Sequence, residues 1–194
     1  MSLQADATLQ LIEARQSVGQ LLEPAPSEQQ LAQAVQAALA APDHHRLRPW
    51  LFLRVQGDAR QQLGELLVQA LQAQGETDLP QLERVRQQPL RAPLIVVAVN
   101  TVQDHPKVPV FEQLLSSGAA VQNLLLMLQE QGFAAIWRTG ALIDAPLLKS
   151  AFGLKTTDQV VGFIYIGTAA RELPARNRLS VGDFLSDWPA TSTV

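Results

Sequence analysis

The sequence contains no cysteine, which excludes disulfides, thiolate metal sites and cysteine nucleophiles. It also lacks a long apolar run, because residues 94–99 form an apolar stretch of only six residues, whereas a membrane-spanning helix needs about 20. Residues 1–6 contain no basic segment followed by an apolar one, so no secretory signal is visible. We therefore expect a cytoplasmic protein without a membrane partner.

The chain has almost no excess charge of either sign, with 15 basic and 18 acidic residues and a net charge of −3. A general nucleic-acid binder needs a basic excess, so nucleic acid is not an expected partner. Lysine is scarce, and 12 of the 15 basic residues are arginines, whose planar guanidinium binds phosphate or carboxylate at two points. Any bound anion must therefore be held by a few local arginines.

Four common catalytic and nucleotide-binding motifs are also missing. The sequence has no Gly-x-Gly-x-x-Gly, no Walker lysine loop, no Gly-x-Ser-x-Gly and no His-Glu-x-x-His. Rossmann dinucleotide binding, NTP hydrolysis, serine-hydrolase chemistry and zinc-protease chemistry therefore lose their usual sequence support.

The sequence does contain enough apolar material for one domain spanning residues 1–194, since 47% of its residues are hydrophobic. Helical spacing of apolar residues, a capping box at Ser27 and Gln30 and an N-cap at Asp58 predict helices up to residue 14 and at 28–40, 59–74, 82–88 and 111–131. Asp144 with Pro146 predicts the start of a sixth, short helix, which Gly153 ends. Apolar, β-branched runs predict strands at 51–55, 94–99, 133–137 and 160–166. This pattern indicates an α+β fold with about four strands.

Two of these helices carry informative apolar patterns. In helix 28–40 we expect Leu31, Val35, Ala38 and Leu39 to face inward. Residues 119–128 of helix 111–131 are apolar almost all round, which places that helix in the centre of the core or in a subunit interface.

Three segments combine polar side chains with a neighbouring apolar element. Arg15-Gln16-Ser17 follows a helix and offers a guanidinium, a hydroxyl and backbone N–H groups to an anion, or it is an exposed arginine at a helix C-terminus. The Pro-framed segment 41–50 contains Asp43, His44 and His45, which suggest a fixed loop, a solvated loop or a metal site. Residues 137–140 end a strand, where sheets often bind ligands, although Trp137 by itself suits a core.

Five segments together resemble the nitroreductase family, and most closely its short-chain branch. They occur in the family's order and spacing and extend over about residues 5–170. The segments are Arg15-x-Ser17, Ala-Pro-Asp-His at 41–44 before Pro49-Trp50, Arg-Ala-Pro-Leu-Ile at 91–95, Gly-Phe at 132–133 followed by Ile-Trp-Arg-Thr-Gly at 136–140, and Val-Gly-Phe-x-Tyr-x-Gly-Thr at 161–168.

The resemblance implies a nitroreductase-like FMN-binding α+β fold, with a mixed sheet flanked by helices and a homodimer that binds one FMN at each end of the subunit interface. It implies that Arg15 and Ser17 hold the FMN phosphate and ribityl chain, while Gln16 stands where the family usually has a second arginine or a similar donor. It also implies that His44 of the partner subunit lies against the flavin, with the backbone of Ala40 nearby.

Further roles follow from the same resemblance. Trp137, Arg138 and Thr139 would border the FMN, and Arg176 and Arg178 would add to the phosphate site. The segment aligned with nicotinamide-cofactor binding comprises Met127, Leu128, Gln129, Glu130, Gln131 and Gly132.

The implied activity is that of an FMN-dependent oxidoreductase, a flavoprotein that passes two electrons from NADH or NADPH to a nitroaromatic or quinone in a ping-pong cycle. The flavin carries this chemistry, so no side chain is assigned a catalytic role and no metal is expected. Trp50, Phe111 and Trp137 are candidates to line the substrate space. The alternatives are a non-catalytic FMN-binding protein, a related fold with dehalogenation or flavin-breakdown chemistry, and a metal-dependent enzyme that uses Asp43, His44 and His105.

Overall fold

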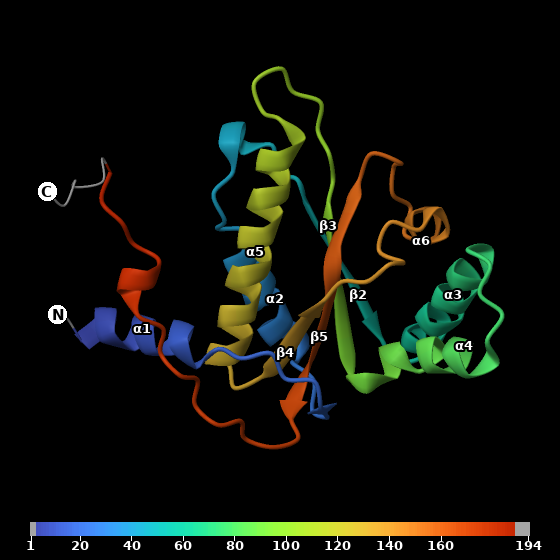
Figure 1. The fold of residues 1–194 in the computed structure, drawn as a ribbon, viewed down its shortest axis with the longest axis horizontal. Coiled ribbons are helices and arrows are strands. Elements are labelled where there is room, and N and C mark those ends of the chain that lie inside the picture. The colour runs from blue at the N-terminus through green and yellow to red at the C-terminus, as the bar shows by residue number, and fades with distance from the viewer. Residues whose placement is uncertain (1–2, 189–194) are drawn as a thin grey trace, which may run out of the picture.

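The computed structural model describes residues 3–188 and contains one sheet between two groups of helices (Figure 1). One face of the sheet is covered by α2 (Glu28–Ala38) and α5 (Val110–Glu130). The other face is covered by α3 (Ala59–Ala73), α4 (Leu79–Arg86) and α6 (Pro146–Ala151). Helix α1 (Leu3–Ala14) and the segment after residue 169 lie side by side at the edge of the molecule. The predicted α+β class is confirmed.

The sheet has five strands, of which β5 makes the most pairings. Strands β2 (Trp50–Gln56) and β3 (Leu94–Asn100) pair with each other, and β5 (Gln159–Ala169) pairs with β3, β4 (Ala134–Arg138) and β1 (Leu21–Leu22). All of these pairings are antiparallel, and a parallel pairing occurs at the isolated bridge between Ser17 and Ala135. Within residues 3–188, the expected mixed sheet is therefore mixed only through this bridge. The expectation of about four strands missed β1, because a two-residue strand leaves no alternating pattern.

Strand β3 is central and buried along its whole length, as its unbroken apolar run predicts. Successive side chains of a strand point to opposite faces. Ile95, Val97 and Val99 therefore pack into the core beneath α3, α4 and α6, while Leu94 and Val96 pack against α2 and α5.

The helix boundaries agree with the sequence to within about three residues, but some local details differ. The capping box of Ser27 and Gln30 is confirmed by both of its hydrogen bonds. The N-cap role of Asp58 is wrong, because its side chain makes no capping hydrogen bond. In α2 the predicted inward positions Leu31, Val35 and Ala38 pack in the core together with Ala34. Leu39 was also predicted to face inward, but it is the C-cap residue and is 44% exposed.

Helix α5 is part of the core in its second half and exposes apolar side chains in its first. Val121, Leu124 and Leu128 are fully buried against the sheet. Near the start of the helix, Phe111 is 62% and Leu115 is 67% exposed. Among residues 3–188, no helix is long and apolar enough to cross a membrane.

Helices α3 and α4 approach closely at Gly64. A Cβ atom at this position would lie 2.3 Å from the backbone carbonyl oxygen of Arg86, so one of the two helices would have to move. We therefore expect Gly64→Ala to lower the free energy of unfolding by about 1–3 kcal/mol, as overpacking does, measured by urea denaturation. Gly118→Ala in α5 is the control, because its Cβ would meet Trp137 at an ordinary 3.9 Å. An unchanged unfolding midpoint for Gly64→Ala would contradict this packing.

Candidate functional site

The segment after α1 runs alongside β4 and carries the first predicted site residues. Ser17 forms a parallel bridge with Ala135, and the backbone N–H of Val18 donates to the carbonyl oxygen of Ala135 at 3.1 Å. The side-chain amide of Gln16 donates to the carbonyl oxygen of Pro174 at 2.9 Å. Arg15 is thus held at the edge of the sheet, and Gln16 attaches the C-terminal segment to the same place.

Arg15 is a cation without a counter-charge in the described part of the chain. It forms no ion pair with residues 3–188. The pKa of its guanidinium is lowered, mainly by partial burial and to a smaller extent by the positive charge of Arg176. Arg178, by contrast, pairs with Glu13 at 2.7 Å. An anion bound between Arg15 and Arg176 would relieve the repulsion between them.

A cavity of about 380 Å³, here called the Arg15 cavity, opens beside this segment. Arg15, Gln16 and Arg171 line it from the two ends of the chain, and Gln129 and Gly132 line it from the end of α5. The other residues of the predicted 127–132 segment diverge, because they lie on different faces of a helix end. Leu128 is fully buried in the core, Glu130 is exposed, Met127 packs against the core, and Gln131 donates to the carbonyl oxygen of Gln30.

Residues 137–139 end β4 and point to both faces of the sheet. The indole N–H of Trp137 donates to the carbonyl oxygen of Val161 at 3.1 Å, and the ring lies over Gly162, where a Cβ would come within 2.1 Å of Nε1. Arg138 points to the opposite face, with its guanidinium carbon 5.9 Å from the ring centroid of Tyr165. Because successive side chains of a strand alternate, Trp137 and Arg138 lie on opposite faces of the sheet. Thr139 is the first residue after β4.

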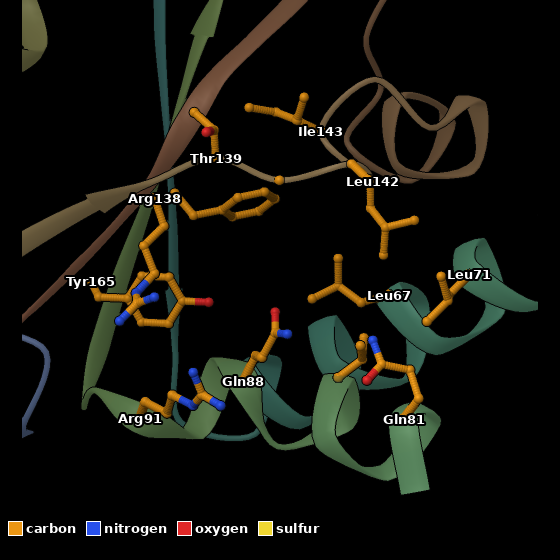
Figure 2. Close-up of a pocket in the computed structure, with 14 residues that line it drawn as sticks. Leu67, Leu71, Gln81, Gln88, Arg91, Arg138, Thr139, Leu142, Ile143 and Tyr165 are labelled. Atoms are coloured by element: carbon orange, nitrogen blue, oxygen red, sulfur yellow. The ribbon is translucent and has the colours of Figure 1, made fainter. Parts of the chain in front are cut away.

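Arg138 belongs to a second cavity, of about 290 Å³, between the sheet and helices α3 and α4, here called the sheet cavity. Figure 2 shows its polar side chains, Arg91, Arg138, Tyr165 and Gln88, gathered toward one end. The other end is formed largely by Leu67, Leu71 and Leu142, with Gln81 as a polar side chain near Leu71. This arrangement suits a flat, mostly apolar ligand with one hydrogen-bonding edge.

Four polar residues that line the sheet cavity, Gln81, Gln88, Arg91 and Tyr165, were not predicted as site residues from the sequence. Gln88 and Arg91 come from a 3-10 turn, η2 (Gln88–Arg91), directly before the buried strand β3, and Tyr165 lies on β5. Burial raises the pKa of the Tyr165 hydroxyl, and Arg138 and Arg91 partly oppose this effect. Tyr165 is therefore a hydrogen-bond donor at neutral pH. Polar residues at the entry to a wholly apolar strand were the signal that could have identified Gln88 and Arg91.

The Pro-framed segment 41–50 is a fixed loop at the other end of α5. Its 3-10 turn η1 (His44–Arg46) precedes β2, and His45, Arg46 and Arg48 have positive φ angles of 60°, 57° and 53°. Each such residue costs roughly 1–2 kcal/mol, so other contacts must hold the loop. The backbone N–H of Arg48 donates to Asp43 at 2.7 Å, and the Ser116 hydroxyl donates to the carbonyl oxygen of Pro42 at 2.6 Å.

His44 and Arg15 lie at opposite ends of α5 within one chain. His44 contacts Glu112 in the first turn of α5, whereas Arg15 shares its cavity with Gln129 in the last turn. The 17 residues from Glu112 to Gln129 span roughly 25 Å at the helical rise. Figure 1 shows the same separation, with residues 39–49 at one end of α5 and α1 at the other. Ala40 lies two residues after the end of α2 and four residues before His44.

The chain's three histidines come together in this region. The ring of His45 lies 4.7 Å from that of His44 and 4.7 Å from that of His105, measured between centroids. Even so, no group of three or more histidine, aspartate or glutamate side chains in residues 3–188 is arranged to hold a metal ion. The geometry of residues 3–188 therefore does not support the alternative of a metal-dependent enzyme that uses Asp43, His44 and His105.

Comparisons with known proteins agree with this architecture. The model of the nitroreductase family matches residues 12–168. The chain is 38% identical to "Putative NAD(P)H nitroreductase YdjA" of Escherichia coli (strain K12), over 90% of this chain and 94% of that protein. It is 33% identical to a "Putative NAD(P)H nitroreductase" of Haemophilus influenzae, over 92% and 97% of the two chains.

Solved structures show the same fold at lower sequence identity. A nitroreductase-like family protein from Bacillus cereus has a TM-score of 0.80 at 22% identity, over 94% of this chain and 96% of that one. The FMN-dependent nitroreductase NfnB from Mycobacterium smegmatis, solved in complex with NADPH, has a TM-score of 0.73 at 17% identity, over 95% and 99% of the two chains. The family match over most of the sequence, the curated relatives and the shared fold lead to one conclusion: the chain belongs to the nitroreductase family.

Proposed function

We propose that this protein is an FMN-dependent oxidoreductase that passes two electrons from NADH or NADPH to a small acceptor, such as a nitroaromatic or a quinone, and that it works as a homodimer. The observation that carries the proposal is that two features occur together beside β4. One is the uncompensated Arg15 beside Arg176, and the other is the sheet cavity with its apolar walls and polar end. The names of the relatives and of the M. smegmatis structure point to the same cofactors.

The phosphate of FMN suits the surroundings of Arg15. A dianionic phosphate needs guanidinium and N–H donors, and Arg176 lies near enough to Arg15 for its positive charge to help lower the pKa of the Arg15 guanidinium. Ser17 adds a hydroxyl two residues further along the chain, and the Gln16 amide is already hydrogen-bonded to Pro174. We infer that Arg15, Ser17 and Arg176 hold the phosphate end, while Arg178 is occupied by Glu13.

The isoalloxazine ring suits the sheet cavity, whose leucines offer an apolar surface and whose Arg91, Gln88 and Tyr165 offer donors to the carbonyl groups of the ring. The two regions are adjacent, because an Arg138 nitrogen lies 3.5 Å from the position that a Cβ of Gly19 would occupy, two residues after Ser17. Thr139 borders the same cavity. The segment that carries Arg15 and Ser17 therefore runs next to Arg138, at the polar end of the proposed ring site.

FMN bound at this surface would supply two-electron transfer, and the chain's own groups would bind and orient it. Arg91 and Arg138 would place positive charge near the polar end of the cavity, and Tyr165 would keep its proton on the hydroxyl oxygen. Of the 127–132 segment, Gln129 and Gly132 line the Arg15 cavity, so we propose that they contact a remote part of the nicotinamide cofactor, because the nicotinamide itself must reach the flavin ring. Trp50, a candidate to line the substrate space, donates its indole N–H to the Ser116 hydroxyl, which in turn donates to Pro42 of the Pro-framed loop.

A second subunit is required if His44 and Arg15 contact the same FMN, because roughly 25 Å of helix separates them in one chain. The surface supports this requirement. Phe111 and Leu115 on α5 are exposed, and so are Phe184 at 74% and Trp188 at 94% in the C-terminal segment. Apolar side chains of this size exposed in groups mark interaction surfaces. We infer that α5 faces α5 of the partner subunit. We also infer that residues 1–194 of each subunit form one domain, although residues 1–2 and 189–194 lie outside the part that the structure describes.

The first prediction concerns the purified protein itself. We expect it to be yellow or to become so with added FMN, to release FMN on denaturation, and to lose the flavin absorbance when NADH or NADPH is added without oxygen. An anaerobic titration followed by visible absorbance measures this. A flavin that binds but is not bleached by either nicotinamide would indicate a non-catalytic FMN-binding protein, and a chain that takes up no FMN would contradict the proposal.

The second prediction separates the phosphate end from the ring end. Riboflavin has the ring and ribityl chain of FMN but no phosphate. Arg15→Ala should weaken FMN binding by about 1.5–3 kcal/mol, roughly tenfold to 150-fold in Kd, and leave riboflavin binding unchanged. Arg91→Ala should weaken the binding of both flavins by a similar factor. Fluorescence titration measures each Kd.

Arg54→Ala is the matched control for both variants, because Arg54 pairs with Glu28 on an exposed surface away from either cavity. It should bind both flavins as the unmodified protein does. Equal loss of FMN and riboflavin in Arg15→Ala would place Arg15 away from the phosphate, and unchanged binding in Arg91→Ala would remove the ring from the sheet cavity.

A third prediction tests the subunit interface. Leu115→Glu should produce monomers that have lost FMN, because a charge would be buried between the two α5 helices. Leu79→Glu is the control, since Leu79 is 75% exposed on α4, on the other side of the sheet, and this variant should stay dimeric. Light scattering with simultaneous visible absorbance reports mass and flavin together. A flavin-loaded Leu115→Glu dimer would argue against this interface.

A further inference from the structure

Glu112 is a surface glutamate that contacts a single residue of the proposed site. Its carboxylate oxygen Oε2 lies 2.7 Å from Nδ1 of His44, and the two side chains are 35% and 51% exposed. Glu112 is in the first turn of α5, and His44 begins the 3-10 turn of the Pro-framed loop, 68 residues earlier. The contact therefore ties the loop to the helix that we place in the subunit interface.

The His44 ring is held from a second side as well. The ring of His45 lies 4.7 Å away at a tilt of 43°, and the ring of His105 lies behind it at a similar distance. The loop's own acid, Asp43, is engaged with the backbone N–H of Arg48. Within residues 3–188, Glu112 is thus the acidic partner of His44, and His45 is its aromatic neighbour.

We propose that Glu112 is a positioning residue that fixes both the orientation and the tautomer of His44. A carboxylate accepts hydrogen bonds only, so Nδ1 must carry the hydrogen and donate it to Glu112. The other nitrogen, Nε2, is then directed away from Glu112 and is free to face the flavin of the partner subunit. This inference rests on the proposed function, in which His44 of one subunit lies against the FMN of the other.

The contact acts on geometry more than on stability. An exposed ion pair adds little to the free energy of folding, because water screens it and ordering the side chains has an entropic cost. A hydrogen bond to one nitrogen of a histidine, however, determines which function the other nitrogen can perform. Removing Glu112 should therefore alter the state of the His44 ring while the protein stays folded.

The test compares Glu112→Ala with Glu112→Gln, whose amide oxygen still accepts from Nδ1. Nitrogen NMR of the imidazoles at about pH 8, where an ordinary histidine is neutral, reports the tautomer, and His44→Gln assigns the signal. We expect the Nδ1–H form in the unmodified protein and in Glu112→Gln. In Glu112→Ala we expect the Nε2–H form, which free histidine favours, and a Kd for FMN raised about threefold to tenfold.

Glu28→Ala is the matched control, because Glu28 is also a first-turn glutamate with an exposed ion pair, to Arg54 at 3.1 Å. It should change neither the His44 signal nor the Kd. An unchanged tautomer in Glu112→Ala would overturn the inference, and so would a changed tautomer with an unchanged Kd. If the unmodified protein binds FMN, either result removes only the role of Glu112, whereas a protein that binds no FMN at all removes the proposed function with it.

Discussion

The pairing of β5 with three other strands is the constraint on which the site depends. Strand β5, eleven residues long, pairs with β3 on one side and with β4 and β1 on the other. This pairing brings the end of β4, with Arg138, beside Tyr165, and the bridge from Ser17 to Ala135 adds the Arg15 segment to the same edge. Side chains from distant parts of the sequence thus converge because backbone hydrogen bonds fix the strands that carry them.

Helix α5 has the opposite effect, since it separates residues that the family pattern groups together. Its second half is buried against the sheet, so it cannot bend to bring His44 and Arg15 together. The same helix exposes Phe111 and Leu115 along its first half. One rigid element therefore both divides the proposed site within a chain and offers the surface through which a second chain would complete it.

The sequence predicted the parts of the molecule that depend on local patterns. The buried run of β3, the capping box at Ser27 and the long helix α5 each follow from neighbouring residues, and the resemblance identified the family. The two-residue β1, the absent cap at Asp58 and the exposure of Leu39 depend on tertiary context that no local pattern records. For the same reason Gln88 and Tyr165, 77 positions apart, could not be recognised as neighbours before the sheet was known.

The central claim is that two copies of the chain form one flavin site, and a dilution series tests it most directly. FMN fluorescence, which is restored when flavin leaves a protein, and dimer mass would be followed on the same samples from high to very low protein concentration. The account predicts that flavin release and dimer dissociation share one midpoint. A monomer that keeps its FMN after the dimer has dissociated would contradict it.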